Sequence, residues 1–520
     1  MRNIWKIFEH LYNRKIAGRG LAIFRIAFTI ILYFEVFQLF YFRHLIFDVI
    51  PYIESYEIAV YPIFIFWFLA LIFLLLGFFT KMAAIINYLL TVILLGTTSS
   101  YEYHMFYSYL TVSFLFIFLP ISKNFSVDRF IAFGGSSAKP QKVSILCYYL
   151  PVFIGVGFVY FDSIFFKLTS SLWMNGLGMW KPASMPQSAF MNITPLLNFK
   201  YLILALGYLT FLFEAIFIFT FWRKSWRVYL LIIGIGLHLG ILICFPIPFF
   251  ALGVSSIYLL MVPVKFWKII FDSKVVRLIS NRLNLFLIYL FESSKIFTDL
   301  LFKKDYRYNS GIIVNRNKVY KKLSFYGIII ITGIQLIVSF NSPLWKNTRE
   351  LLMVEDHIVI KKTENAIKLM TSVTRDFLGI TNHGVFMDSH FENYNHSIAV
   401  VYKPENGEDV WLPLTNEKGT PGNYLFGPIW IKWTFRANNP NIDQEVLKES
   451  IRDFIAFWAH KEEVDLDNAT FSIKVKKNRV PHEWEKNFLN NQLSNPWIEA
   501  GYVTWKNEEF YPNIKDIEKL

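Results

Sequence analysis

Long apolar runs constrain the fold of this chain of 520 residues more than any other feature of its sequence. Nine runs have about the length that a membrane-spanning helix needs, 17–25 residues. They are residues 22–42, 60–80, 83–99, 105–121, 145–168, 200–222, 227–247, 249–264 and 324–340. Hydrophobic residues make up 54% of the chain, which exceeds their share in most soluble domains. The sequence therefore predicts an α-helical polytopic membrane bundle of about nine transmembrane helices.

The positive charges between the runs predict which side of the membrane each loop faces. With the N-terminus inside the cell, the inner loops hold 26 Lys and Arg, whereas the outer loops before the ninth span hold three. Cytoplasmic loops carry an excess of Lys and Arg, so we expect a multi-pass protein of the cell (inner) membrane with a cytoplasmic N-terminus. The loop 265–322 holds 13 of these basic residues and is expected to lie on the anionic inner leaflet. Charge is the only feature that would favour nucleic acid, so the lipid bilayer is the expected partner.

Four regions follow from this order of runs and loops. Residues 1–265 are predicted to form an eight-helix membrane domain that begins with a basic segment on the membrane surface. Residues 266–322 form a basic cytoplasmic loop, in which the apolar stretch 284–291 is too short to span a membrane. Residues 323–341 form the ninth transmembrane helix, and residues 342–520 form an α+β domain outside the cytoplasm.

The last region contains short patterns of both strand and helix type. Residues 396–414 are predicted to form two strands around a turn at Asn406-Gly407, 429–436 a third strand and 470–477 a further strand. Residues 444–461 have the apolar spacing of an amphipathic helix. The eight tryptophans between Trp345 and Trp505 favour core packing, with ligand or membrane contact as the alternative.

Several classes of site are not indicated by the sequence. The two cysteines, Cys147 and Cys244, lie in separate apolar runs and do not form a CxxC pair, which argues against thiol redox chemistry and a disulfide framework. No HExxH, Walker or GxGxxG motif occurs, and no metal site is expected.

Four ionisable residues inside the runs need partners, because charge is costly in lipid. Arg25 and Glu35 are ten residues apart on the first run, about 15 Å along a helix, so they cannot pair with each other. Asp162 and Glu214 lie in the fifth and sixth runs. Ion pairs between helices are the favoured interpretation for all four, with a functional role as the alternative.

Three residues capable of proton transfer are predicted to lie in the outer half of the membrane: His104, Lys167 and His238. A lysine taken out of water loses part of its preference for the charged form and can act as a base. The alternative is a lysine that reaches out to water from a helix end. Because Lys167 is placed at a helix end, its replacement by Ala is expected to remove activity but to change stability little. For each histidine the alternative is a packing role, because a shared depth does not establish lateral proximity.

Several motifs, in order, resemble one family. They are "GLAIFRIAFTIILYFEVF" (20–37), "YEYHMFYSYL" (101–110), "NFSVDRF" (124–130), "DSIFFKLTSSLWMNG" (162–176), "GIGLHLGILICFPIPFFAL" (234–252) and "LGITNHGVFMD" (378–388). Their order and spacing resemble the vitamin K-dependent gamma-carboxylase and its bacterial relatives, the horizontally transferred transmembrane (HTTM) domain family. The resemblance covers residues 17–265 best.

The resemblance implies a lyase that couples oxygenation of a reduced quinone, of the vitamin K or menaquinol type, to carboxylation of a glutamyl side chain. O2 and CO2 would be co-substrates, and the peptide or protein substrate would come from the extracytoplasmic side. Lys167 matches the family's base, and His104 and His238 match histidines near the quinone. His104, Trp173 and His238 are thus the expected cofactor-binding residues.

The chain also departs from the family's pattern. The carboxylase has Lys-Lys-Leu-Asp where this chain has Phe166-Lys167-Leu168-Thr169, and the spacing to Trp173 is one residue longer. Two alternatives therefore remain open at this point. One is a quinone-binding or lipid-binding membrane protein of the same fold without carboxylase activity, and the other is a non-catalytic transport or assembly protein.

Overall fold

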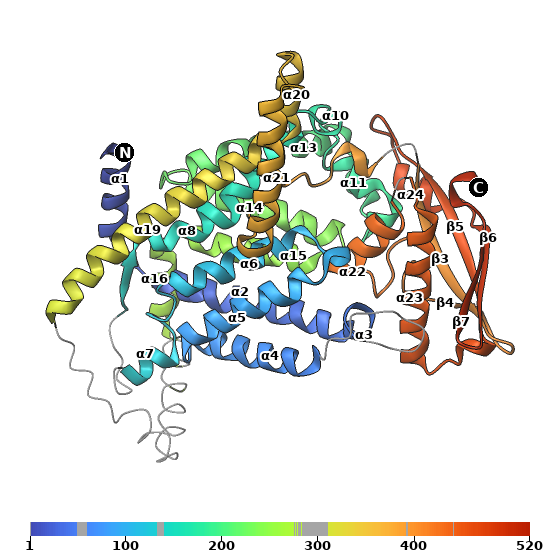
Figure 1. The fold of residues 1–520 in the computed structure, drawn as a ribbon, viewed down its shortest axis with the longest axis horizontal. Helices are drawn as coiled ribbons and strands as arrows, with labels where there is room; N and C mark the ends of the chain where they lie inside the picture. The colour runs from blue at the N-terminus through green and yellow to red at the C-terminus, as the bar shows by residue number, and fades with distance from the viewer. Residues whose placement is uncertain are drawn as a thin grey trace.

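The computed structural model describes residues 2–48, 60–132, 140–274, 310–391, 394–439 and 441–520, together with positions 276, 278 and 282. Most of these residues are helical, and a small β-sheet region lies at the C-terminal end of the chain. Figure 1 shows the apolar helices side by side as one bundle, with the sheet beside one end of it. The stretch 284–291 and most of the basic loop lie outside the described residues.

Five helical segments are long and apolar enough to cross a membrane. They are Arg19–Tyr41 (α2), Ile145–Lys167 (α8, η2 and α9), Lys200–Thr220 (α13), Arg227–Cys244 (α14) and Val319–Asn341 (the end of α19 with η5). A sixth candidate is the pair Pro248–Met261 (α15 with η4) and Val264–Asp272 (α16), bent by 93°. The chain is thus consistent with a membrane protein.

The predicted count of nine spans is not confirmed. Three of the expected spans are shorter helices, α4 (Val60–Leu76), α5 (Thr80–Gly96) and α6 (His104–Phe118). Their 17, 17 and 15 residues correspond to about 22–26 Å of helix, less than the ~30 Å of a hydrocarbon core. The runs 60–80 and 105–121 are longer than α4 and α6, so run length overestimated the length of these two helices. The run 83–99 has the length of α5 but is shifted by three residues.

The helical segment that carries Lys167 is interrupted. It consists of α8 (Ile145–Val152), a π-helical turn η2 (Phe153–Gly157) and α9 (Phe158–Lys167). Pro151 lies inside α8 and lacks the N–H that a regular helix needs, which explains why the helix changes its winding there. Four short helices follow α9 in the chain: α10 (Ser171–Met174), α11 (Trp180–Ser184), η3 (Pro186–Ser188) and α12 (Thr194–Leu197).

Seven further helical elements connect or flank the bundle. They are α1 (Arg2–Asn13), α3 (Arg43–Ile46), η1 (Ser99–Tyr101), α7 (Val127–Ala132), α19 (Ser310–Val338), α20 (Pro343–Leu351) and α21 (Ile358–Leu378). A two-stranded sheet of β1 (Lys15–Ala17) and β2 (Lys142–Ser144) joins the segments after α1 and α7. Phe8 of α1 packs against Phe325 of α19, with their ring centroids 5.1 Å apart.

The C-terminal region contains an antiparallel sheet in the order β4-β3-β5-β6-β7. The strands are β3 (Tyr394–Lys403), β4 (Val410–Trp411), β5 (Thr470–Arg479), β6 (Ile498–Lys506) and β7 (Glu509–Ile514), accompanied by α23 (Gln444–Glu462) and α24 (Phe488–Leu493). The predicted hairpin at Asn406-Gly407, the helix within 444–461 and the strand within 470–477 are confirmed.

The predicted strand at 429–436 is wrong. These residues form α22 (Gly427–Ile431) and the π-helical turn η7 (Lys432–Ala437). Gly427 has a φ of +50°, and Pro428 occupies the first turn, a position that favours helix initiation. The alternating pattern also has Trp430 and Trp433 three residues apart, a spacing that places both on one helix face, where both are buried.

The predicted ion pairs of Arg25 and Glu35 are replaced by contacts with neutral groups. Arg25 donates hydrogen bonds to the carbonyl oxygens of Ile121 (2.9 Å) and Phe125 (2.5 Å). Glu35 Oε2 accepts hydrogen bonds from the hydroxyls of Tyr103 (2.5 Å) and Tyr109 (3.0 Å). Both residues are almost fully buried, and their hydrogen bonds hold α2 against α6 and the segments on either side of α6.

Asp128, in α7, caps the N-terminal end of the helix α5. Its carboxylate accepts hydrogen bonds from the backbone N–H groups of Phe79 (2.7 Å) and Thr80 (2.9 Å). These N–H groups have no partner within the helix, so the carboxylate satisfies them and opposes the helix dipole.

Candidate functional site

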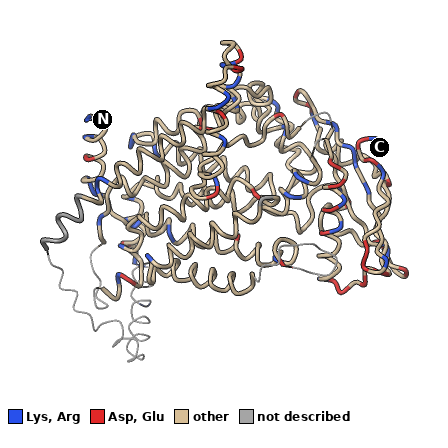
Figure 2. The backbone as a smooth tube through the Cα atoms, viewed as in Figure 1, with Lys and Arg blue, Asp and Glu red and all other residues tan. Residues whose placement is uncertain are grey.

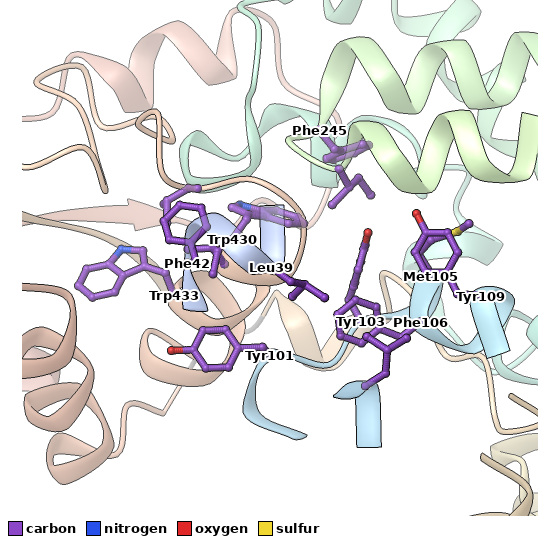
Figure 3. Packing of buried hydrophobic residues seen from close by; sticks show 14 of the residues in the cluster. Leu39, Phe42, Tyr101, Tyr103, Met105, Phe106, Tyr109, Phe245, Trp430 and Trp433 are labelled. Atoms are coloured by element: carbon purple, nitrogen blue, oxygen red, sulfur yellow. The ribbon is translucent and has the colours of Figure 1, made fainter. Parts of the chain in front are cut away.

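A cavity of about 380 Å³ lies where the helical bundle meets the segments around it. Four expected site residues, from four different segments, line its wall: His104, Lys167, Trp173 and His238. Further polar lining residues are Glu102, Tyr160, Ser163, Thr210, Glu214, His383, Ser389, His390, Arg436 and Asn439. Figure 3 shows aromatic side chains of the surrounding core, among them Tyr103, Phe245 and Trp430, which also line the cavity. Residues that are far apart in the sequence, from Glu102 to Asn439, thus line the same cavity.

Lys167 is the last residue of α9, and its side chain is turned into the protein. The residue is 4% exposed, and Nζ lies 2.5 Å from Oε2 of Glu214 on α13. Nζ also lies 4.0 Å from the centroid of the Trp173 ring, a cation–π distance. The alternative of a lysine that reaches out to water is therefore wrong.

The depth of Lys167 follows from its partner. Glu214 comes 14 residues after the start of α13, about 21 Å along the helix. Lys167 therefore lies well below the level at which α13 begins, and Trp173 of α10 packs against its Nζ. The expectation that this lysine adds little stability does not hold, because its loss would leave a buried carboxylate without a partner.

His238 ends a chain of three hydrogen-bonding side chains. Its Nε2 lies 2.9 Å from the hydroxyl of Tyr160, which lies 2.9 Å from the hydroxyl of Tyr258. The three residues come from α14, α9 and α15, so the chain ties these helices together. Nδ1 of His238 is buried and has no hydrogen-bond partner among the described residues. A ligand hydroxyl or carbonyl in the cavity would satisfy it.

His104 begins α6 and faces a second histidine that sequence reasoning missed. Nδ1 of His104 lies 3.4 Å from Nδ1 of His383, in the loop after α21, and the ring centroids are 5.5 Å apart. Burial lowers the pKa of His383 well below its ordinary value of 6.5, and His104 lowers it further. His383 is therefore neutral at physiological pH and offers one donor and one acceptor nitrogen.

The loop 379–391 closes one side of the cavity and is held at three points. Trp173 Nε1 donates to the carbonyl of Phe386 (3.0 Å). Asp388 accepts from the Ser171 hydroxyl (2.8 Å) and from the backbone N–H of Leu172 (3.0 Å). Asp162 accepts from the backbone N–H of His383 (2.6 Å). The loop is thus fastened to the segment that carries Lys167.

The entry to this loop depends on a glycine. Gly379 ends α21 with a φ of +66°, and a Cβ there would lie 2.0 Å from the carbonyl oxygen of Tyr107.

The pKa of Asp388 lies below its ordinary value of 3.8. Burial raises this pKa, but hydrogen bonds from Ser170, Ser171 and Leu172 lower it by more. The carboxylate is therefore ionised when it accepts hydrogen bonds from the start of α10.

The structure brings all four predicted site residues to one cavity, together with lining residues that were not predicted as site residues. Glu214 had a signal in the sequence, because it is a carboxylate in an apolar run and such a residue needs a cation. His383 lies in the motif 378–388 but was not singled out within it, and His390 and Arg436 had no comparable signal, since they lie in the C-terminal region far from the spans in sequence. Among the described residues, no group of three His, Cys, Asp or Glu side chains is placed to hold a metal ion.

Comparison of the chain with models of protein families, with curated proteins and with solved structures gave no match. The function is therefore argued from the cavity and from the motifs that its walls contain.

Proposed function

We propose that the chain is a membrane enzyme of the vitamin K-dependent gamma-carboxylase type, which binds a reduced quinone in this cavity and uses Lys167 as the base. The observation that carries the proposal is the position of Lys167 Nζ. It is buried in the cavity wall, against Trp173, in the same space as His104 and His238. Each of these four residues comes from a motif that resembles the HTTM domain family.

The cavity suits a flat, amphiphilic aromatic molecule. Its volume of about 380 Å³ lies in the range of small-molecule sites. Apolar and aromatic side chains form much of the wall, including Leu237, Ile241 and Phe250. Lys167 and the unpaired Nδ1 of His238 supply the polar contacts. A quinol ring with hydroxyl groups on opposite sides could contact both.

The Lys167–Glu214 pair can accept one proton. The pair is neutral as a whole, as ammonium and carboxylate or, after a proton has moved from Nζ to Glu214, as amine and carboxylic acid. In the second form Nζ can take the proton of a quinol hydroxyl. Lys167 then becomes an ammonium group, and the pair gains one positive charge. That charge balances the negative charge left on the ligand oxygen, in a site that excludes bulk water. Glu214 thus holds Nζ in place and keeps the pair neutral before the transfer.

A bound reduced quinone would supply, with O2, the oxidising chemistry that the resembled family uses to remove a γ-proton from a glutamyl side chain before CO2 adds. The residues of this chain would bind and orient the ligand and exclude water. The loop 379–391 covers the cavity and supports the last of these roles.

The position of Arg436 supports the proposal that the substrate is an anionic peptide. Arg436 is exposed, lies on η7 and lines the cavity. No acidic side chain forms an ion pair with it among the described residues. A guanidinium binds a carboxylate through two parallel hydrogen bonds, so a glutamyl side chain is a fitting substrate group.

The proposal includes an orientation in the inner membrane, with a cytoplasmic N-terminus and an extracytoplasmic C-terminal domain. Figure 2 shows Lys and Arg gathered at the end of the bundle where α1 and α7 lie, whereas both signs are mixed over the sheet region. This asymmetry supports the orientation through the excess of positive charge in cytoplasmic loops.

Turnover of a reduced naphthoquinone in oxygen tests the proposal, with incorporation of labelled CO2 into a glutamate-containing peptide as a second readout. The double variant Lys167→Met/Glu214→Gln removes both charges and keeps the volume. Its turnover should fall by about 10²–10⁴-fold, the usual size of a general-base contribution. Lys200→Met is the matched control, because Lys200 lies at the start of α13 and outside the cavity lining.

The results distinguish the proposed enzyme from a quinone-binding or lipid-binding protein and from a transport or assembly protein. Turnover of the double variant within twofold of the wild type would remove Lys167 as the base. Saturable quinone binding without turnover by the wild-type protein would favour a quinone-binding or lipid-binding protein, and no binding would favour transport or assembly.

A further inference from the structure

A helical hairpin, α20 and α21, follows the last candidate span and projects from the bundle. α20 begins two residues after the span Val319–Asn341 ends, and α21 returns towards the bundle. In Figure 1 both helices lie across the direction of α19, and the turn between them extends beyond the outline of the bundle. Because the candidate spans define the direction across the membrane, the hairpin lies along the membrane and does not cross it.

The tip of this hairpin is apolar and exposed. Leu351, Leu352, Met353, Val354, Ile358 and Val359 are all exposed there, Met353 by 93% and Leu351 by 84%. Met353 has a φ of +55°, and the turn is closed by hydrogen bonds from Met353 N–H to Glu350 O (2.9 Å) and from Val354 N–H to Arg349 O (3.1 Å). A formed turn therefore presents these side chains outward.

An apolar stripe continues from the tip along α21. Leu369, Val373 and Phe377 follow at intervals of four residues and are exposed, by 72%, 52% and 51%. Ile367 and Thr374 on another face of the helix are buried against the molecule. Residues four apart lie on one face of a helix, so α21 is attached by one side and shows a second apolar side outward.

Charged side chains flank the tip without covering it. Lys361 pairs with Asp356 (2.8 Å), and Lys346 lies 3.8 Å from both Glu350 and Glu355. A helix with an apolar face beside a charged face is typical of an element that lies in the membrane interface.

The apolar surface of the hairpin continues the outer surface of the bundle. Exposed apolar side chains of α19, among them Tyr326, Ile330 and Leu336, lead towards it. Trp345 of α20 is 41% exposed beside Phe165 of α9, with ring centroids 6.5 Å apart. Tryptophan is enriched at membrane–water boundaries. Lipid is thus the occupant that fits both surfaces.

We infer that the α20–α21 hairpin is an interfacial anchor, whose tip and stripe insert into the membrane leaflet on the side of the C-terminal sheet. The charged residues beside the tip remain at the lipid headgroups. α21 leads through Gly379 directly into the loop that covers the cavity, so the anchor fixes the depth of that loop. The inference rests on membrane insertion of the bundle and is independent of the chemistry at Lys167.

Site-directed fluorescence tests the anchor in the full chain. Cys147 and Cys244 are replaced by Ala, and single cysteines replace Met353, Val373 or Asn406, the last in the exposed turn between β3 and β4. Each cysteine carries an environment-sensitive fluorophore, and the protein is placed in phosphatidylcholine nanodiscs. Quenching by lipid-borne nitroxides is compared with quenching by aqueous iodide.

The labels at positions 353 and 373 should be quenched by the lipid-borne nitroxides. Iodide should quench them at least severalfold less than the label at position 406. Equal iodide quenching at 353 and 406, with no nitroxide quenching at 353, would overturn the inference. So would efficient cross-linking between position 353 of two copies, because the tip would then be an interface between copies. Leu352→Cys provides a second tip position where Met353→Cys does not fold.

Discussion

Lys167 and Glu214 are buried side chains of opposite charge. Each offsets the cost of burying the other. Nζ and Oε2 lie 2.5 Å apart, and both side chains are below 10% exposed. Removing one partner leaves an uncompensated charge, whereas removing both leaves two neutral groups of similar volume. The pair is therefore a structural unit as well as a candidate base.

This coupling predicts a strongly non-additive mutant cycle. Lys167→Met and Glu214→Gln should each destabilise the protein by about 3–5 kcal/mol, and the double variant by less than the sum. Thermal unfolding in one detergent measures all four proteins. Additive changes would show that the two side chains do not interact, contrary to the geometry.

His383 makes stability depend on pH. Burial lowers its pKa well below the ordinary 6.5, so the unfolded chain binds a proton below about pH 6.5 that the folded chain does not bind. Stability should therefore fall from pH 7.5 to 5.5, by up to about 1.4 kcal/mol per pH unit for such a group. His383→Gln should reduce this slope in melting experiments, while the control His482→Gln, at an exposed position, should leave it unchanged. An unchanged slope in His383→Gln would contradict the assignment.

Among the elements, the loop 379–391 matters most for the site, because it turns a groove between helices into a covered cavity. It is held by the hydrogen bond from the Leu172 N–H of α10 to Asp388 and by the Trp173–Phe386 hydrogen bond. Neither contact follows from periodicity, because a loop has none.

Asp388→Ala should loosen this loop. Hydrogen bonds to a charged acceptor contribute about 1.5–3 kcal/mol each at most, and less at this partly exposed site. Limited proteolysis should cut within 379–391 faster than in the wild type, and quinone affinity should fall. The control is Asp409→Ala, which removes an exposed carboxylate of the β3–β4 turn. Equal proteolysis of both variants would show that Asp388 does not hold the loop.

Hydropathy located the helices of the bundle well, because an apolar run has to be buried or face lipid. It did not locate their ends, since α4 and α6 stop while the sequence is still apolar, and α5 begins three residues before the run that predicted it. The segment 429–436 shows a second limit. Its alternation suits a strand, but Trp430 and Trp433 also suit one face of a helix, and core packing decides between the two.

At the scale of the whole molecule, the site is an assembly of segments far apart in sequence. His104, Lys167 and His238 could be placed at similar depths from the order of the runs. Their lateral proximity could not be predicted, because one sequence does not reveal which helices are neighbours. The contributions of His383 and Arg436 depend on how the C-terminal region packs on the bundle.

The proposed orientation predicts opposite labelling of two single cysteines. In intact cells, Asn406→Cys should react with a membrane-impermeant maleimide, and Lys142→Cys should react only after the membrane is opened, because Lys142 lies in a predicted inner loop. The reverse pattern would invert the orientation, and the proposed peptide substrate would then come from the cytoplasm.

Chemical rescue tests the central claim most directly. Lys167→Ala should leave a space where the ammonium group was, and a small alkylamine added from solution can occupy it. Quinol oxidation by this variant should be nearly absent, should return with added ethylamine, and should increase with the basicity of the amine. Oxidation at the wild-type rate without any amine would show that Lys167 is not the base.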